Sequence, residues 1–327
     1  MPHSHEPGPG AEFQGEPTPP RLDLHSIREL EVLVGYTCQE IKSLARVAGG
    51  HYSPFDKRAR PRPFQRKPLS RKVRRIDNPL EDLKKIQRRI QRRLLRPLVL
   101  PQYLCGGVRG KTVLDAVMLH IGSAVLVKLD IRNFFPRITN LQVYDVWSKL
   151  LNCSPEISSL LTKLTTYERH VPQGAPTSSL LANLVLYIVD APIRNTCKEK
   201  GVRYSSWVDD LAFSGDDARE VVNTAVEALR AGGFSVSHKK LRIMGPGDRK
   251  VLCGVLMGKF PNVVRERISN LRSGIHKLRA GRVPWATREE YLRALDGGIQ
   301  QVATINARRG KALAEQLKAV IELNPSD

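Results

Sequence analysis

Hydrophobic residues recur at helical spacing in three parts of the chain. Apolar positions between residues 24 and 47 predict short helices, and Thr37 followed by Glu40 has the spacing of a capping box at a helix N-terminus. From residue 80 to 94, apolar residues recur every three or four positions, which predicts an amphipathic helix. Residues 265–323 are also rich in helical patterns and have no clustering of acids or histidines typical of an enzyme site.

The middle of the chain has the pattern of short strands. Residues 124–131 form a short run rich in β-branched side chains, typical of a buried strand. Residues 204–214 predict a hairpin of two short strands with Asp209 and Asp210 at its tip. Further helices are expected over 141–165, with a break near Ser154, over 178–191 and over 221–229, and short strands over 234–236 and 251–256. This order predicts an α+β domain with helices packed on one face of a sheet.

Composition and charge restrict the class of protein. The chain has 327 residues, with 53 Lys and Arg against 32 Asp and Glu, which gives a net charge of +21. An excess this large predicts a polyanionic partner, either nucleic acid or an anionic membrane surface. The five cysteines form no CxxC pair, which argues against a zinc site and a disulfide framework. No apolar stretch is long enough for a membrane span and no signal peptide is visible, so we expect a soluble, cytoplasmic protein.

The positive charge is concentrated between residues 57 and 96, where 17 Lys or Arg accompany three acids. Asn78 and Pro79 are expected to start the helix in this segment, as N-cap and first helical residue. Six basic residues of the helix lie mostly away from its apolar positions: Lys84, Lys85, Arg88, Arg89, Arg92 and Arg93. A solvated face is the alternative for any one of them. Because like charges repel unless something neutralises them, the whole segment favours a phosphate-binding surface.

Three aspartates occupy positions where an acid is costly. Asp130 ends a buried apolar run, and the adjacent Asp209 and Asp210 have apolar residues on both sides. Buried carboxylates destabilise a fold unless a positive charge neutralises them. Oxygen ligands suit Mg²⁺, and two Mg²⁺ ions held by shared aspartates can activate a hydroxyl group and stabilise a leaving pyrophosphate. The alternative is that Asp130 caps a turn and the other two form a surface hairpin tip, but their combination with a basic neighbourhood favours metal.

These motifs, in this order, resemble the bacterial reverse transcriptases, most closely those of retrons. The fingers segment of that family is matched by RKVRRIDNPLEDLKKIQRRI and its first catalytic strand by VKLDIRNFFPRI. Its template-positioning turn and helix resemble VPQGAPTSSLLANL, and its Y-x-D-D hairpin resembles YSSWVDDLAFSG. The two motifs that follow are matched by GFSVSHKKLRIM and LCGVLM, and a thumb signature by LDGGIQQVATIN. The resemblance runs from about Val32 to Leu317.

The resemblance implies a right-hand polymerase with fingers, palm and thumb. The expected divisions are a disordered tail over 1–21, N-terminal helices over 22–56, basic fingers over 57–124, a palm over 125–260 with a fingers insertion at about 141–172, and a helical thumb over 261–327. In such an enzyme Asp130 and Asp209 would hold two Mg²⁺ ions, with Asp210 as the supporting third acid.

The resemblance also implies nucleotide-binding residues. Phe135 would exclude a ribose 2′-hydroxyl, although a core phenylalanine beside Phe134 is the alternative. Gln173 would contact the incoming nucleotide or the template. Arg74 or Arg75 would clamp the triphosphate, since guanidinium groups suit forked phosphate contacts. Lys240 would lie near the leaving pyrophosphate, with its neighbour Lys239 as a rival.

Three motifs depart from the retron pattern. The usual N-A-x-x-H element begins with Asp115 here and ends with His120, which we expect to be a packing or RNA-contact residue. The usual V-T-G element reads Leu252-Cys253-Gly254. Trp207 replaces the tyrosine of Y-x-D-D, which predicts altered nucleotide handling or weaker activity.

The function implied by the resemblance is RNA-directed DNA synthesis. A retron enzyme would use dNTPs to copy part of a structured partner RNA, prime from a 2′-hydroxyl of that RNA and give a branched RNA–DNA product. It would act in phage defence, usually with a separate effector protein. The alternatives are a non-retron bacterial reverse transcriptase of the defence-associated or intron-like kind, a non-catalytic RNA-binding protein on a polymerase scaffold, and a peripheral membrane protein. The last would explain the charge but not the acids.

Overall fold

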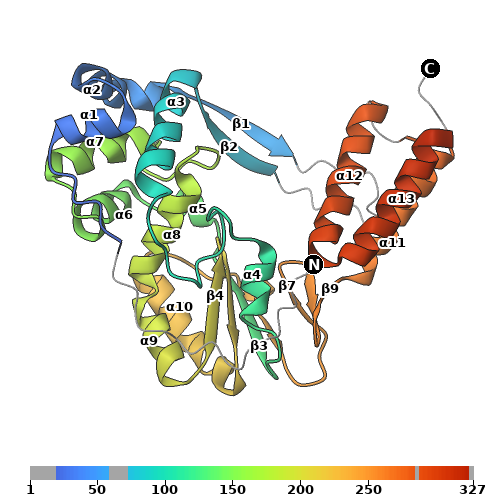
Figure 1. Cartoon of the computed structure of the whole chain (residues 1–327). Helices are drawn as coiled ribbons and strands as arrows, with labels where there is room; N and C mark the ends of the chain where they lie inside the picture. The colour runs from blue at the N-terminus through green and yellow to red at the C-terminus, as the bar shows by residue number, and fades with distance from the viewer. Residues whose placement is uncertain (1–19, 59–72, 284–286, 324–327) are drawn as a thin grey trace, which may run out of the picture. The chain divides into compact units, whose positions relative to one another are not determined.

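The computed structural model describes residues 20–58, 73–283 and 287–323 (Figure 1). The predicted tail lies almost wholly outside the described residues. The chain forms two compact units, one made of residues 1–55 and 76–246, the other of residues 56–75 and 247–327. The predicted α+β class is confirmed, whereas the boundaries of fingers, palm and thumb stay predictions.

The first unit begins with two capped helices, α1 (Ile27–Val34) and α2 (Cys38–Val47). The predicted capping box is confirmed, because Thr37 Oγ1 accepts a hydrogen bond from Glu40 N at 3.3 Å and the Glu40 carboxylate accepts one from Thr37 N at 2.7 Å. These helices pack with α3 (Glu81–Ile90), a π-helical turn (Gln91–Leu95) and α7 (Pro155–Thr165). Four of the predicted apolar positions face the core: Leu83, Ile86, Ile90 and Leu94 are all fully buried.

The predicted start of α3 is wrong. Asn78 and Pro79 belong to a strand, β2 (Val73–Pro79), which pairs with β1 (Tyr52–Arg58), and the helix N-cap is Leu80. Leu80 N donates a hydrogen bond to His51 O at 2.8 Å, so a contact with a distant residue keeps the chain extended. Tertiary pairing therefore overrides the local capping preference.

A four-stranded antiparallel sheet forms the centre of the first unit (Figure 1). Its order is β4 (Arg203–Trp207), β5 (Asp210–Ser214), β3 (Leu126–Asp130) and β6 (Arg242–Met244). The predicted buried strand and hairpin are confirmed as β3 and as β4 with β5. In the β3–β5 pairing, Asp130 lies opposite Asp210. Directly opposed residues of an antiparallel pair project from the same face of the sheet.

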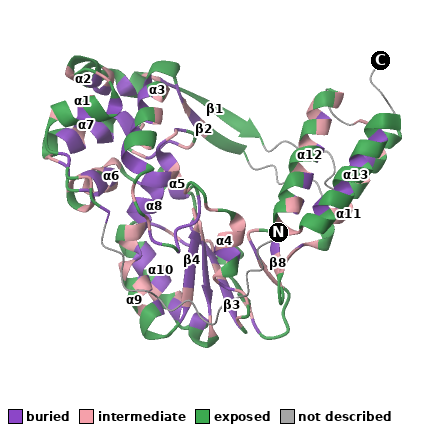
Figure 2. Cartoon of the chain, in the orientation of Figure 1, coloured by how far each residue is buried: buried purple, intermediate pink, exposed green. Residues whose placement is uncertain are grey.

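Both faces of this sheet are covered near β4 and β5, which differs from the predicted one-sided packing. Consecutive buried residues along β5 show this, since a half-exposed strand would alternate (Figure 2). On one face Tyr204 and Phe213 stack with ring centroids 5.1 Å apart, next to α9 (Ala191–Glu199), the helix that follows α8 (Ser178–Val189). On the other face lie α4 (Val113–Met118) and the turn after it, where His120 bonds to side chains of both strands.

Several expected elements have different limits. The helix expected over 178–191 is two helices that meet at Asp190, and that over 221–229 is α10 (Val221–Ala231). The 141–165 region is α6 (Asn140–Asp145), a π-helical turn (Val146–Leu150) and α7, with the break where it was expected. Residues 234–236 make only a single bridge, between Ile131 and Val236, so no strand forms there. Residues 251–256 are two strands, because Cys253 and Gly254 both have positive φ and turn the chain back.

The described residues of the second unit from 247 onward form a small sheet and three helices. The sheet is β7 (Lys250–Leu252), β8 (Val255–Met257) and β9 (Pro261–Val263), in that order. The helices are α11 (Arg265–Arg279), α12 (Arg288–Ile305) and α13 (Ala307–Leu323), which confirms the helical prediction for this region. Each has buried residues along one side (Figure 2), and these form a core of their own around Leu271, Tyr291 and Leu295. No helix in the described parts of the chain is long and apolar enough to cross a membrane.

Candidate active site

The two predicted halves of the acidic site meet through backbone pairing. Asp130 is the last residue of β3 and has 6% of its surface exposed. Ile131 N donates a hydrogen bond to Asp209 O at 2.8 Å, directly after the position where Asp130 lies opposite Asp210. Segments about 80 residues apart are therefore fixed side by side by the β ladder, which holds backbone positions more firmly than loop contacts would.

A tight turn carries the adjacent aspartates. Residues 207–210, here named the aspartate turn, join β4 to β5, with Trp207 paired to Asp210 and Val208 and Asp209 between them. Val208 has a φ of 61°, which is unfavourable for a β-branched residue. This conformation places Asp209 at the tip of the hairpin and Asp210 at the first position of β5.

The charges at this site oppose one another. Burial raises the pKa of Asp210, and the neighbouring carboxylates of Asp209 and Asp130 raise it further, while Lys128 and Lys240 lower it. Lys240 Nζ lies 2.5 Å from Asp130 Oδ2, and this hydrogen bond raises the pKa of the lysine. Lys240 belongs to a short 3₁₀ turn (His238–Lys240) that follows the bridge from Ile131 to Val236. The ammonium groups of Lys240 and Lys128 thus partly neutralise the cluster.

The carboxylates of Asp130, Asp209 and Asp210 are suitable ligands for a divalent cation, although their oxygens do not converge on one metal position. Within the ranges that the structure describes, no three His, Cys, Asp or Glu side chains converge closely enough to hold a metal. Two observations still fit Mg²⁺: burial and the neighbouring carboxylates raise the Asp210 pKa, and the Lys240 ammonium group occupies Asp130 Oδ2 as a stand-in cation. Carboxylate oxygens are the ligands that Mg²⁺ prefers.

Gln173 lies in a turn whose backbone is fixed from β2. Gln173 O accepts a hydrogen bond from Asp77 N at 3.0 Å, and Gln173 N donates to Asp77 Oδ2 at 3.3 Å. Gly174 has a φ of 134°, and a Cβ there would lie 2.9 Å from Ile76 Cγ2, so the turn requires glycine. The Gln173 side chain remains half-buried at the edge of the turn.

Asp77 is a positioning residue that sequence reasoning missed. Its side chain is almost fully buried, and its Oδ2 also lies 3.3 Å from His170 Nε2. A signal was present, because Asp77 is one of only three acids among the 17 basic residues of segment 57–96. An acid retained in so basic a segment indicates a specific partner.

The two phenylalanines after Asp130 have different surroundings. Both belong to the short helix α5 (Phe134–Arg137). Phe134 is buried, with its ring 5.3 Å from that of Phe234, and takes the core position. Phe135 is only half-buried, and its ring lies 6.0 Å from that of Phe134. The structure therefore separates a packing ring from a partly accessible one.

His120 does not face a ligand, which corrects the expected RNA contact. Its side chain is fully buried. One ring nitrogen lies 2.7 Å from Ser214 Oγ and the other 2.7 Å from Ser205 Oγ. Burial, with a smaller effect of Arg203, lowers the pKa of His120 to about 3, so the ring is neutral. It links two strands of the sheet, which is the packing role that was the other expectation.

The basic residues of α3 and of the π-helical turn that follows it (Gln91–Leu95), here called its extension, lie at the surface, as predicted. Some have local partners: Arg88 pairs with Glu81 at 3.0 Å, and the Arg89 guanidinium lies over the Tyr36 ring. Arg92 and Arg93 are exposed. Arg74 and Arg75 are exposed on β2, in the part of the strand that belongs to the second unit. Their role at a triphosphate stays a prediction.

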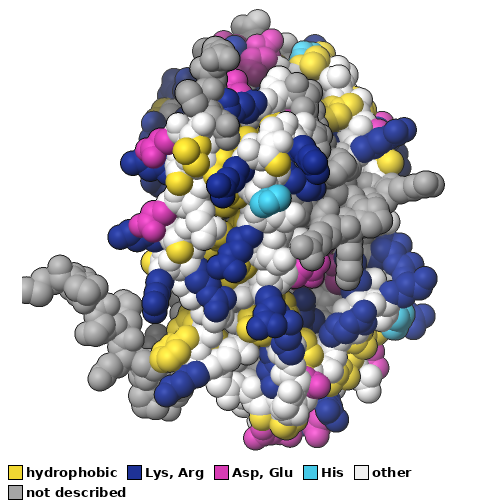
Figure 3. All heavy atoms as spheres, turned by 90° about the vertical axis from the view of Figure 1, so that its right-hand side faces the viewer, with side chains coloured by type: hydrophobic (Ala, Val, Ile, Leu, Met, Phe, Trp, Pro, Cys, Tyr) yellow, Lys and Arg dark blue, Asp and Glu magenta, His cyan; other side chains and the backbone are white. Residues whose placement is uncertain are grey.

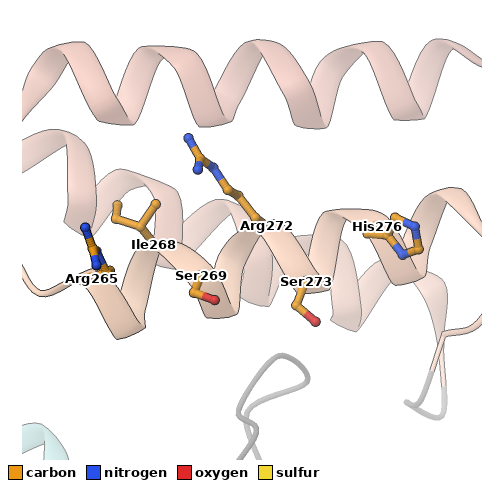
Figure 4. Close-up of a pocket in the computed structure, with 6 residues that line it drawn as sticks. All are labelled: Arg265, Ile268, Ser269, Arg272, Ser273 and His276. Carbon is orange, nitrogen blue, oxygen red and sulfur yellow. The ribbon is translucent and has the colours of Figure 1, made fainter.

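A basic groove on α11 was not predicted. A cavity of about 630 Å³ is lined by Arg265, Ile268, Ser269, Arg272, Ser273 and His276 (Figure 4). A neighbouring cavity of about 230 Å³ shares some of these residues and adds Arg309 and Gln316 from α13. Basic side chains also far outnumber acidic ones on the face shown in Figure 3. The sequence signal was a polar stripe at helical spacing, residues 265, 269, 272 and 276, in a segment examined only for enzyme-like clusters.

Comparisons with known proteins place this geometry in a family. A family model described as reverse transcriptase (RNA-dependent DNA polymerase) matches residues 65–267. The retron Mx65 reverse transcriptase of Myxococcus xanthus is 30% identical over 275 residues, which cover 75% of this chain and 61% of that protein. The retron Ec86 reverse transcriptase of Escherichia coli is 27% identical over 265 residues, covering 80% and 82%. The chain therefore spans less than two thirds of the first relative and about four fifths of the second.

A solved structure is also similar. The telomerase of Candida albicans, in a complex with a fragment of telomeric RNA, aligns with a TM-score of 0.45 and 10% identity, over 84% of this chain and 59% of that one. The family model alone covers more than half of the chain and includes all three aspartates. The chain belongs to the reverse transcriptase family of RNA-dependent DNA polymerases and is similar to retron reverse transcriptases.

Proposed function

We propose that this protein is the reverse transcriptase of a retron, which copies part of a structured partner RNA into DNA that stays joined to that RNA. The observation that carries the proposal is the pairing of Asp130 with Asp210 beside the aspartate turn, with Lys240 bonded to Asp130. Buried like charges at one edge of a sheet destabilise a fold, and they are explained by a site that binds cations and polyphosphates.

The three aspartates would form the metal site. Asp130 and Asp209 would hold two Mg²⁺ ions, and Asp210 would support them through its charge. When bound, these ions activate the primer hydroxyl and stabilise the leaving pyrophosphate. The Lys240 ammonium, which bonds to Asp130, would neutralise charge on the leaving pyrophosphate or donate a proton to it. The protein otherwise contributes positioning and electrostatics rather than covalent chemistry.

The nucleotide would be held by residues around this site. The half-buried Phe135 ring would exclude a 2′-hydroxyl group by overlap, so that dNTPs are preferred. Gln173, with its backbone fixed by Asp77, would contact the incoming nucleotide or the template. Arg74 or Arg75 would bind the triphosphate through forked hydrogen bonds. These assignments rest on the motif matches and agree with the exposure of each side chain.

The nucleic acid would be bound by two basic surfaces. One is the exposed face of α3 and its extension with Lys84, Lys85, Arg88, Arg89, Arg92 and Arg93; the other is the groove on α11. Both present several Lys, Arg or polar side chains, and few of these pair with an acid among the described residues, so they are available for phosphate contacts. No membrane partner is expected.

The retron assignment goes beyond polymerase activity. The relatives at hand are named as retron enzymes, and from that similarity we infer priming from an RNA 2′-hydroxyl, a branched product and a role in phage defence with a separate effector. Asp115 at the start of the N-A-x-x-H element, and Leu252-Cys253-Gly254 in place of V-T-G, favour a non-retron bacterial reverse transcriptase as the second candidate.

The test is to express the gene with its native flanking DNA, purify the protein and sequence the nucleic acid bound to it. We expect a short DNA joined through a 2′,5′ branch to a structured RNA, present with wild type and absent with Asp209→Asn. DNA without a branch would change the assignment from a retron enzyme to another bacterial reverse transcriptase. If wild type and Asp209→Asn both carry RNA without DNA, the result would favour a non-catalytic RNA-binding protein.

A further inference from the structure

Residues 101–107, here named the brace, run beside β4 at the edge of the central sheet. Ser206 N donates a hydrogen bond to Tyr103 O at 2.8 Å, and Cys105 N donates to Ser206 O at 2.9 Å. These bonds form a parallel bridge between Leu104 and Ser206, the residue directly before the aspartate turn. The brace therefore satisfies backbone groups of an edge strand at the point where the turn begins.

Gly106 brings the brace into direct contact with the turn. A Cβ at this position would lie 2.4 Å from Val208 N, 2.6 Å from Val208 Cγ2 and 2.8 Å from the Trp207 carbonyl carbon. Gly106 is not among the glycines with positive φ, so glycine is required for close approach and not for an unusual torsion. Two of the three contacts are backbone atoms of the turn, which means that a side chain here would displace the turn itself.

The brace is fixed from behind by α8. Asn183 is fully buried in this apolar helix, and its Nδ2 donates a hydrogen bond to Gly106 O at 2.8 Å. A Cβ on Gly107 would lie 2.6 Å from Ser179 Cβ, so the brace is enclosed between α8 and the turn. A buried amide destabilises a helix core unless it is hydrogen-bonded, which makes the Asn183 bond to the brace a specific contact.

A buried charged group fixes the start of the brace. The Tyr103 hydroxyl donates to Asp190 Oδ1 at 3.1 Å, and the Tyr204 hydroxyl donates to Asp190 Oδ2 at 3.0 Å. The two tyrosine rings stack with centroids 4.8 Å apart. Arg194 forms an ion pair with Oδ1 of the same carboxylate, so both carboxylate oxygens of the fully buried Asp190 have hydrogen-bond partners. This network joins the brace to β4 and α9.

We propose that the brace positions the aspartate turn for catalysis, with Gly106 and Asn183 as its positioning residues. Val208 holds an unfavourable positive φ, and such a conformation persists only where the surroundings impose it. Gly106 supplies that surface directly, and Asn183 holds Gly106 in place. The brace thereby determines where Asp209 lies relative to Asp130. This inference rests on the proposed function only in taking the turn as catalytic.

The test compares wild type with Gly106→Ala in the addition of one deoxynucleotide to a primed RNA template. Gly50→Ala is the control, since nothing lies within 4 Å of a Cβ at that position. We expect kcat to fall about 100-fold, the loss typical of a catalytic group displaced by about 1 Å. The KM for the nucleotide and the affinity for template and primer should stay near wild type, because residues 101–107 include no Lys or Arg and so add no charge to either basic surface.

A spectroscopic readout separates positioning from general damage. In protein labelled with 5-fluorotryptophan at its three tryptophans, Gly106→Ala should shift the ¹⁹F resonance of Trp207 and leave that of the buried Trp147 unchanged. Equal shifts of both resonances with a matching loss of thermal stability would overturn the proposal, as would a folded Gly106→Ala protein with the wild-type kcat.

A second variant decides the question if Gly106→Ala does not fold. Asn183→Leu removes the amide donor at similar volume, and we expect a smaller loss of kcat with a Trp207 shift in the same direction. A wild-type kcat in this variant would overturn the proposal. If wild type itself incorporates no nucleotide, the proposed function is wrong. The positioning of the turn by the brace is then tested by the shift of the Trp207 resonance alone.

Discussion

Asp130 and Asp210 lie opposite each other on neighbouring strands, enclosed by the sheet and its hydrogen bonds, whereas Arg92 and Arg93 extend into solvent from the end of one helix. The first region depends on a few backbone positions, each fixed by contacts from distant parts of the chain. The second depends on the number of charges on a face, with little that fixes any one of them. We therefore expect single substitutions to abolish function in the first region and to weaken it gradually in the second.

The largest expected effect is that of Asp209→Asn. We expect DNA synthesis to fall by more than about 1,000-fold, since metal-ion charge stabilisation is worth several kcal/mol. RNA binding should stay nearly intact, because the proposed phosphate contacts come from the two basic surfaces and not from the aspartates. Primer extension and filter binding on the same preparation measure the two. An equal loss of RNA binding and DNA synthesis would contradict the separation between a catalytic aspartate site and an RNA-binding basic surface.

Replacement of Lys240 should have the next largest effect. Lys240→Met removes the ammonium group at Asp130, and we expect a loss of about 100-fold in the rate of nucleotide addition, as for a positioned charge or proton donor. Lys239→Met is the matched control on the same 3₁₀ turn and should lose much less. A larger loss for Lys239→Met would transfer the role to that residue.

The pH dependence of stability tests the buried centre of the sheet. The pKa of His120 is about 3 in the folded protein and near 6.5 when unfolded. A lowered folded pKa means that the stabilisation is fully present above pH 6.5 and is lost as the pH falls towards 3. His120 should contribute a slope of up to about 1.4 kcal/mol per pH unit in that window. Urea unfolding of wild type and His120→Gln at pH 7.5 and pH 5 measures it, and equal slopes would contradict the burial of a neutral ring.

The smallest effect is expected on the basic face. The double variant Arg92→Ala with Arg93→Ala should weaken RNA binding a few-fold and reduce the slope of log K against log salt by about 2. The rate of synthesis at saturating RNA should not change. Lys42→Ala with Lys149→Ala removes the same charge from lysines that pair with acids elsewhere, and should leave the slope unchanged. An equal change in both double variants would mean that only net charge matters.

The elements that sequence reasoning placed correctly are those with local signals. β3 and the hairpin of β4 and β5 follow from short apolar runs, and the capping box at Thr37 follows from spacing alone. The errors arise where a distant contact decides. Asn78 and Pro79 have the pattern of a helix start, but the bond from Leu80 N to His51 O keeps the chain extended there.

The candidate site shows the same division. The three aspartates could be selected from their sequence surroundings, whereas the register that pairs Asp130 with Asp210 belongs to the folded sheet. For His120 the sequence left both a packing role and an RNA contact open, because no local pattern indicates the two serines that enclose it. The contact of Asn183 with Gly106 joins residues 77 positions apart and gives no signal in either segment.

The most direct test of the central claim is the addition of a single nucleotide to a primed RNA of known sequence, with each of the four dNTPs in turn and Mg²⁺ present. The account predicts that only the dNTP complementary to the template base is added, that the matching ribonucleotide is rejected, and that EDTA stops the reaction. Addition that ignores the template base, or no addition by a protein that binds the RNA, would contradict the assignment of the three aspartates as an RNA-directed polymerase site.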